Sequence, residues 1–336
     1  MNRFDERDTI FSRLELVPGS KQYDSYYTNR PELKDTDDRL RTLSAGVYAH
    51  DRSNMARIDS AFRFLKDIRP LAPGPAKAEN SSQNAISIKE IEQGLHAAAM
   101  DYGAVLYGQA VLGLECFYSV RGRGPAYGKP VNNPHRNALI FAVEMNRGKI
   151  SHAPRPEEAV EVTRAYVRVA VIGMILSYFL RELGYEARCH MDGESELILP
   201  AAAQVAGLGK IGRIGLLLTP DFGPRVRLGA VTTNFPAASF SGSNLNEAHQ
   251  PADYCARCDL CARRCPGKAI PFKAALETGK VGLQNTTAAK KADTNVAPET
   301  KNSPWKIEHK ACFAIWKKFG TDCGICVSVC PYGEAQ

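Results

Sequence analysis

The stretch Cys255-Ala-Arg-Cys258-Asp-Leu-Cys261-Ala-Arg-Arg-Cys265-Pro266 holds four cysteines separated by two, two and three residues. This is the cysteine run of bacterial ferredoxins, in which three closely spaced thiolates bind one [4Fe–4S] cluster and the fourth binds a second cluster. The proline ends the run and turns Cys265 away from the first three cysteines. The stretch therefore predicts a two-cluster iron–sulfur unit in this part of the chain.

A second cysteine group supplies the remaining ligands. Cys312 lies upstream of Cys323, Cys326 and Cys330, and Pro331 follows the last of these. The crossed rule of two-cluster ferredoxins divides the eight cysteines into two sets. One set is Cys255, Cys258, Cys261 and Cys330, and the other is Cys265, Cys312, Cys323 and Cys326. Structural zinc is the alternative, but zinc sites rarely combine three cysteines at this spacing with two Cys-Pro endings.

The chain has 336 residues, ten cysteines and a formal charge of +7. Crowded Cys-x-x-Cys repeats in a chain of this size favour metal over disulfides, and the isolated Cys116 and Cys189 are expected to be buried apolar residues. Two oxidised clusters, at about −2 each, would reduce the charge to roughly +3. No long run of Lys and Arg occurs, so a nucleic-acid partner is not expected.

The longest apolar stretch covers residues 169–180 and is flanked by Arg168 and Arg181. A bilayer requires roughly 20 such residues, so no transmembrane segment is predicted. The polar N-terminus has no signal core. We therefore expect a soluble, cytoplasmic protein, with export as the alternative if a signal peptide has been removed.

Composition and periodicity divide the chain into three parts. Residues 1–80 are polar and patchy, and are expected to form an extension that packs on another unit. Residues 81–245 are expected to form an α+β core, because helical and strand patterns mix without a βαβ rhythm. Residues 246–336 hold the cysteine groups, with a solvated loop predicted at 279–304.

Several elements of the core can be placed by residue. Ser87 and Glu90 have capping-box spacing, which predicts a helix from Ser87 to about Met100. Continuous apolar runs predict strands at 104–108, 138–143 and 227–233. A long helix is predicted from Pro156 to Leu183, stopped by Gly184. Its buried stripe is predicted to contain Tyr166, Val169, Gly173, Leu176 and Leu180.

The segment Gly207-Leu-Gly209-Lys-Ile-Gly212 matches the G-x-G-x-x-G pattern. The dinucleotide-binding form of this motif follows a strand and precedes an acidic residue by about 20 positions. Neither condition is met, since Ala201 to Val205 is a poor strand and Asp221 comes too early. The glycines are therefore expected to form a tight backbone bend, or to allow close approach of a flat cofactor.

Three polar side chains are candidates for the reaction centre. Tyr166 faces inward on the long helix, where most tyrosines are core residues. Arg225 and Arg227 flank Val226, so in an extended segment they point to opposite faces and one of them faces the interior. A buried arginine needs a partner or a function.

Several segments together resemble the reductive dehalogenases. They are Arg3-Phe-Asp-Glu-Arg-Asp8, Tyr26-Tyr27, Pro31-Glu-Leu, Ala142-Val-Glu-Met145, Tyr178-Phe-Leu-Arg-Glu-Leu-Gly-Tyr185 and Ala206-Gly-Leu-Gly-Lys-Ile-Gly-Arg-Ile-Gly-Leu-Leu-Leu-Thr-Pro-Asp-Phe-Gly-Pro-Arg-Val-Arg227. The complete first cysteine group followed by a stretched second group is also that family's pattern. Residues 186–196 depart from it, with Glu and Asp where an asparagine is expected.

The resemblance implies a nitroreductase-like core that binds a corrinoid and a C-terminal ferredoxin-like domain with two [4Fe–4S] clusters. The clusters would pass electrons to cobalt, which cleaves a carbon–halogen bond of a small organohalide. Tyr166 matches the proton-donating tyrosine, and Arg225 or Arg227 the basic residue beside it, while Gly207, Gly209 and Gly212 would contact the cofactor. A positive charge beside a tyrosine stabilises the phenolate and so aids proton donation. A ferredoxin or flavodoxin would be the electron donor, and a homodimer is possible in this family.

Two other functions remain open at this point. Epoxyqueuosine reductase is a related corrinoid iron–sulfur enzyme that acts on tRNA, but it would want a basic groove that the sequence does not show. A plain electron-transfer protein would need only a small scaffold, and 245 residues precede the cysteine part. Cobalt content separates an electron carrier from either enzyme.

Overall fold

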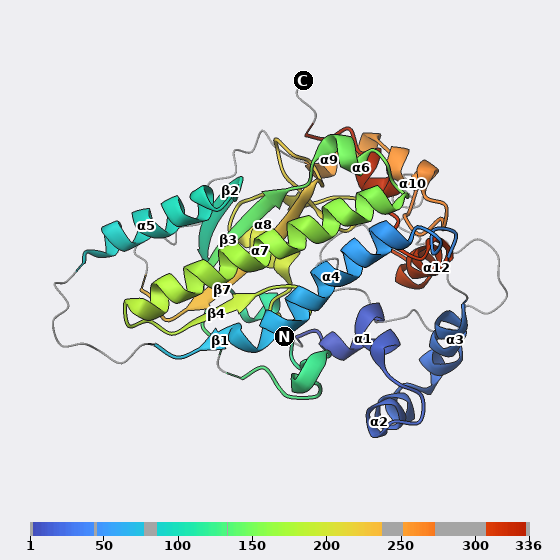
Figure 1. The fold of residues 1–336 in the computed structure, drawn as a ribbon, viewed down its shortest axis with the longest axis horizontal. Coiled ribbons are helices and arrows are strands. Elements are labelled where there is room, and N and C mark those ends of the chain that lie inside the picture. The colour runs from blue at the N-terminus through green and yellow to red at the C-terminus, as the bar shows by residue number, and fades with distance from the viewer. Residues whose placement is uncertain are drawn as a thin grey trace.

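The computed structural model describes residues 3–43, 46–76, 86–132, 134–236, 251–272 and 307–333. The loop predicted at 279–304 lies outside these ranges. Helices and strands alternate irregularly around one central sheet (Figure 1). The prediction of a mixed α+β architecture is therefore confirmed.

A five-stranded antiparallel sheet forms the centre, in the order β1-β4-β7-β3-β2. The strands are β1 (Pro73–Gly74), β2 (Leu106–Val111), β3 (Asn137–Glu144), β4 (Ala187–His190) and β7 (Val226–Thr233). The predicted strands at 138–143 and 227–233 are confirmed within one residue. The strand predicted at 104–108 begins at Leu106, because the Ala104 N–H still donates to the Ala99 carbonyl of the preceding helix, although the Val105 N–H already donates to Ala142 of β3.

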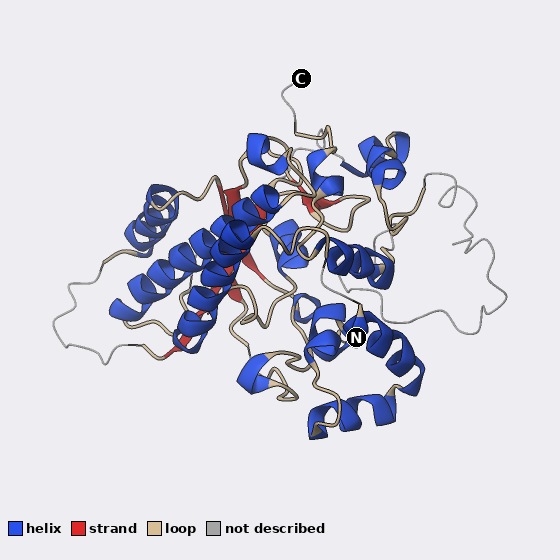
Figure 2. Cartoon of the chain, turned by 45° about the vertical axis from the view of Figure 1, so that its right-hand side comes forward, coloured by secondary structure: helices blue, strands red, loops and turns tan. Residues whose placement is uncertain are grey.

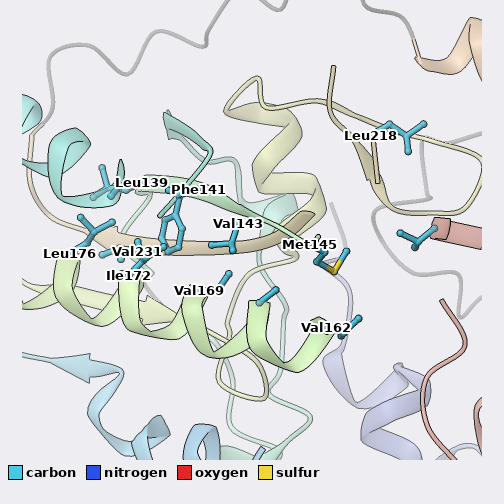
Figure 3. Packing of buried hydrophobic residues seen from close by; sticks show 14 of the residues in the cluster. Leu139, Phe141, Val143, Met145, Val162, Val169, Ile172, Leu176, Leu218 and Val231 are labelled. Atoms are coloured by element: carbon cyan, nitrogen blue, oxygen red, sulfur yellow. The ribbon is translucent and has the colours of Figure 1, made fainter. Parts of the chain in front are cut away.

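The long helix α7 (Pro156–Glu182) lies across one face of the sheet and ends at Leu183, followed by Gly184 with φ +86°. Figure 3 shows Val169, Ile172 and Leu176 of α7 pointing at Phe141 and Val231 of the sheet. The predicted helix is confirmed, and its stripe is buried at Val169, Gly173, Leu176 and Leu180, whereas Tyr166 is partly buried.

Gly229 of β7 explains how closely α7 approaches the sheet. It pairs with Phe141 of β3, and a Cβ added to it would lie 2.6 Å from atoms of Phe141 and Val169. Any larger side chain would push the helix away. The smallest residue therefore stands where helix and sheet are closest.

Side-chain alternation along β3 divides the core into two parts. Leu139, Phe141 and Val143 pack under α7, whereas Ala138 and Ile140 face α8 (Leu199–Val205) on the opposite side. This is the period of two expected for a sheet covered on both faces. The helix α5 (Ile88–Asp101) packs at the edge beside β2, and the predicted capping box of Ser87 and Glu90 is present.

The N-terminal residues form four helices: α1 (Ile10–Glu15), α2 (Lys21–Asn29), α3 (Pro31–Thr42) and α4 (Arg52–Ile68). The first three enclose a buried ion pair, in which Arg13 Nε donates to Asp37 Oδ2 at 2.8 Å and Tyr27 donates its hydroxyl proton to the same oxygen. Helix α4 packs along α7, as Figures 1 and 2 both show. Strand β1 extends the central sheet, so the last part of the predicted 1–80 extension belongs structurally to the core.

The cysteine segments form short helices: α9 (Pro251–Arg257), α10 (Leu260–Arg264), α12 (His309–Phe319) and α13 (Ile325–Ser328). Helix α12 contacts α1 near the other end of the chain, with the Phe11 and Trp316 ring centroids 5.4 Å apart. Val47 N–H donates to the Lys318 carbonyl at 2.9 Å, so a second N-terminal segment also lies against this part. Among the described helices, none combines the length and apolar character needed to cross a bilayer.

His190, at the end of β4, is a buried titratable group with no solvent exposure. Its Nε2 lies 2.9 Å from Thr232 Oγ1, and its Nδ1 accepts the Glu196 N–H at 3.2 Å. Burial, reinforced by Arg188 and Arg121, lowers the pKa of His190 well below its ordinary value of 6.5. The native protein therefore keeps this ring neutral where the unfolded chain would protonate it.

We expect acid to destabilise the fold through His190. Below pH 6.5 the unfolded state binds one proton more than the native state, so this residue alone removes about 1.4 kcal/mol of unfolding free energy per pH unit. A His190→Gln variant should lose that component of the slope. Urea unfolding of both proteins at pH 7 and pH 5.5 measures it, and equal pH dependence in the two would contradict the prediction.

Candidate active site

A small cavity lies between α10 and the hairpin of β5 (Lys210–Ile211) and β6 (Leu217–Leu218). Four of its lining residues are Cys255, Cys258, Cys261 and Cys330. These are the cysteines assigned to the first cluster by the crossed rule, and they come from segments far apart in the sequence. The donor set is entirely sulfur, which fits an iron–sulfur cluster.

The other four cysteines are also neighbours. Burial raises the pKa of the Cys312 thiol to about 11 and that of Cys323 to about 12, and Cys265 adds to both effects. Burial raises the pKa of the Cys326 thiol, and the neighbouring Cys312 and Cys323 raise it further. In the described ranges, no three His, Cys, Asp or Glu side chains converge as closely as a single metal ion requires. The cysteines of the second set thus influence one another electrostatically, while their assignment as one ligand set and their cluster remain predictions.

A cavity of about 660 Å³ opens where the N-terminal helices, the core and the cysteine part meet. Side chains at helical spacing on three helices form most of its walls. They include Met55, Ile58, Asp59, Phe62 and Lys66 of α4, Ala159, Val162, Thr163 and Tyr166 of α7, and Phe313, Trp316 and Lys317 of α12. This volume lies within the range of cavities that bind cofactors and small organic ligands.

Tyr166 and Arg227 lie together in this cavity. The guanidinium carbon of Arg227 lies 4.9 Å from the centroid of the Tyr166 ring, a cation–π contact. The Nε atom of Arg227 is buried and has no hydrogen-bond partner among the described residues, so this side chain retains a donor within the site. Of the two candidate arginines, Arg227 is therefore the one beside Tyr166.

Arg225 occupies a different environment. It is buried just before β7, and its Nη2 donates to the Gly333 carbonyl at 3.5 Å. Its charge lowers the pKa of Cys330, against the larger effect of burial. Arg225 thus lies beside the cysteine part and is not a lining residue of the large cavity.

The charges around Tyr166 act in opposite directions. Arg227 lowers the pKa of Tyr166, but burial together with Asp192 and Asp322 outweighs it, so the net pKa is raised. The expected effect of the arginine is present, although the net shift is opposite to the one that its charge alone would give. The phenol is consequently protonated at neutral pH, the state that a proton donor requires.

Glu158 links this cavity to the cysteine part. It is 1% exposed, and burial followed by the neighbouring Asp322 raises its pKa to about 9, against the effect of Arg227. Asp322 lines the cavity and directly precedes Cys323. A protonated carboxyl group therefore lies between Arg227 and the segment that carries the second cysteine group.

The glycine motif has a structural explanation within the chain. A Cβ on Gly209 would collide with the Leu218 carbonyl, and one on Gly212 with the Leu218 side chain. Gly207 has φ +75°, in the left-handed region. Gly209 and Gly212 therefore allow the close pairing of β5 and β6, and Gly207 turns the chain after α8. This is the tight bend expected from the sequence, while contact with a cofactor remains a prediction.

Sequence reasoning missed several charged lining residues of the cavity. Asp192, the first residue of the turn between Met191 and Glu194, is held by Arg69, whose Nη2 donates to Asp192 Oδ2 at 2.9 Å. Asp192 stands in the 186–196 stretch that departs from the dehalogenase pattern. Asp322 could have been found from its position next to Cys323, but nothing in the sequence places Arg69 or Asp192 beside Tyr166.

No protein-family model matches the chain, but several known proteins are similar to it in sequence. The tetrachloroethene reductive dehalogenase of Sulfurospirillum multivorans is 29% identical over 61% of this chain and 37% of its own length. That of Dehalobacter restrictus is 28% identical over 60% of this chain and 34% of its own. The epoxyqueuosine reductase of Lactococcus garvieae is 28% identical over 57% of this chain and 46% of its own.

A solved structure of the catabolic reductive dehalogenase NpRdhA superposes on the whole chain with a TM-score of 0.67, at 22% identity, and this covers 42% of that protein. The chain is thus similar to reductive dehalogenases in sequence and shares the fold of one of them. The resemblance inferred from the sequence is confirmed, and its relatives are oxidoreductases. The chain spans between a third and a half of the length of the relatives that it matches.

Proposed function

We propose that this chain carries the catalytic part of a corrinoid-dependent reductive dehalogenase. The observation that carries the proposal is the large cavity in which Tyr166 and Arg227 lie together, bordered by the segment leading into Cys323. A reductase needs a proton donor and an electron path at one place. Similarity to the tetrachloroethene reductive dehalogenases and the shared fold of NpRdhA, which has been described with 3-bromo-4-hydroxybenzoic acid bound, support the choice of an organohalide.

The overall reaction takes two electrons and one proton, and converts an organohalide into the dehalogenated product and a halide ion. The corrinoid, when bound, would supply the electrons that break the carbon–halogen bond. Tyr166 would donate the proton from its hydroxyl group to the carbon that loses the halide. Arg227 would stabilise the phenolate that remains. The aromatic side chains of Phe11, Phe313 and Trp316 would hold an apolar substrate and exclude water.

The eight cysteines would hold two [4Fe–4S] clusters in a ferredoxin-like domain, and the α+β core would be nitroreductase-like and bind the corrinoid. An external ferredoxin or flavodoxin would supply the electrons. The partly apolar walls of the cavity fit a small organic ligand. An epoxyqueuosine reductase-like activity is the second candidate, supported by the relative from Lactococcus garvieae.

The first test is metal content. The protein, produced without oxygen and with a corrinoid supplied, should contain about eight irons and one cobalt per chain. Halide release from chlorinated and brominated aromatic and alkene substrates, with a reduced low-potential dye as donor, then tests the activity. Turnover of epoxyqueuosine-tRNA with no halide release would favour the second candidate. Iron without cobalt would leave an electron carrier, and zinc in place of iron would contradict the proposal.

A further inference from the structure

The glycine-rich segment that resembles a nucleotide-binding loop builds a hairpin instead. Lys210 pairs with Leu218 and Ile211 with Leu217. Gly212 N–H donates to the Leu216 carbonyl at 2.9 Å, and Gly215, with φ +70°, closes the tip. The residue at the start of this tip is Arg213.

Arg213 is the largest side chain without any solvent exposure in the described part of the chain. Its guanidinium group holds the first cysteine segment by the backbone. Nε donates to the Cys258 carbonyl at 3.1 Å, Nη1 to the Pro271 carbonyl at 2.8 Å, and Nη2 to the Cys255 carbonyl. The backbone N–H of Arg213 also donates to Cys255 Sγ at 3.5 Å. One residue thus contacts both the main chain and a sulfur atom of the predicted first-cluster site.

The position is electrostatically unusual for a structural clamp. Burial lowers the pKa of Arg213, and its charge interacts with the sulfur atoms of Cys261, Cys255 and Cys258. Arg213 also lines the small cavity that these cysteines share with Cys330. A full positive charge therefore borders the predicted cluster site in a region without water contact, where charge interactions are much stronger than at the surface.

We propose that Arg213 is a positioning residue that holds the first-cluster loop and raises the reduction potential of the first cluster. This inference rests on the iron–sulfur part of the proposed function, and is independent of dehalogenation and of the corrinoid. Net charge and hydrogen bonds to sulfur are among the main determinants of cluster potential. Reduction adds one negative charge to the cluster, so a fixed cation beside it stabilises the reduced state.

The consequence concerns the direction of electron flow. A cluster whose reduced state is stabilised accepts an electron more readily from a donor of given potential. The first-cluster set lies on α9, on α10, between these two helices and after α13. The second set includes Cys323, next to Asp322 of the large cavity. Arg213 would therefore favour reduction of the first cluster, whereas the second cluster is the one whose ligand segment borders the cavity of Tyr166.

The test is an EPR-monitored redox titration of the iron-loaded full chain. In Arg213→Met, the ratio of reduced to oxidised first cluster at the wild-type midpoint is expected to fall about tenfold, which equals about 59 mV for one electron. Arg213→Lys keeps the charge and should remain close to wild type. The potential of the second cluster should not change in either variant.

Arg181→Met is the matched control. Arg181 is also a buried arginine that donates to carbonyl groups, those of Ala72 and Ala187, but it lies at the far end of α7. This variant should lower stability without moving either potential. If Arg213→Met fails to assemble its first cluster, the potentials of Arg213→Gln and Arg213→Lys are compared instead. Both variants lose the branched guanidinium group, but only the lysine variant keeps the positive charge.

An unchanged first-cluster potential in Arg213→Met, or equal potentials in the Gln and Lys variants, would overturn the inference and leave Arg213 a structural clamp. A wild-type chain that assembles no iron–sulfur cluster would contradict the proposed function itself. The two failures are thus distinguishable from the same set of samples.

Discussion

Tyr166→Phe is expected to lower the rate of halide release by about 10²- to 10⁴-fold, the usual contribution of a positioned general acid. The substitution removes only the hydroxyl group. The ring would keep its packing against Phe62, with centroids 6.3 Å apart, and its place under Arg227. Single-turnover assays with the corrinoid already reduced isolate the chemical step from electron delivery.

Tyr178→Phe is the control for this prediction, because Tyr178 lies on the same helix and its side chain is 45% exposed. It should retain wild-type activity and the same iron and cobalt content. Near-normal halide release from Tyr166→Phe would exclude Tyr166 as the proton donor. The proton would then come from another group in the cavity or from water.

Paired cysteine substitutions should reveal the crossed ligand sets. Cys330→Ala and Cys326→Ala stand four residues apart, yet each is expected to damage a different cluster. Combining them should therefore roughly double the iron loss of either single variant. The double variant of Cys330→Ala and Cys258→Ala should lose little more iron than Cys330→Ala alone. Both cysteines line the same small cavity and are therefore expected to bind the same cluster.

Iron and sulfide analysis of the purified variants measures these losses. Cys116→Ala, a buried cysteine outside both groups, is the control and should keep about eight irons. Uncrossed ligation predicts the reverse pattern, with additive loss for Cys330 and Cys258 and little extra loss for Cys330 and Cys326. The experiment thus needs no assignment of individual spectra.

The features that the sequence predicted well depend on local patterns. Cysteine spacing grouped the four cysteines that line the small cavity, and the 3.6-residue period of α7 located its buried face. The capping box at Ser87 marked the start of α5, because both partners lie within one turn. The apolar run of β3 was recognisable because both of its faces are covered.

The features that the sequence could not predict depend on contacts between distant segments. Residues at 73–74 join the sheet only because β4 offers an edge to pair with. The choice of Arg227 over Arg225 depends on where β7 begins relative to α7, which no local pattern fixes. The glycine motif was ambiguous because the pairing of β5 with β6 needs glycine at two of the positions, Gly209 and Gly212, that a nucleotide-binding loop would use.

The contact between α1 and α12 has a consequence for how the protein matures. The large cavity is walled by Phe11 from one end of the described chain and Trp316 from the other. During synthesis the first helices leave the ribosome long before α12 exists, so the cavity cannot close on the nascent chain. The cavity therefore gains its full set of walls only at the late stage at which the last cysteines become available. A large cofactor can thus be fitted between these walls before α12 packs against α1, whereas a small substrate can enter the folded protein.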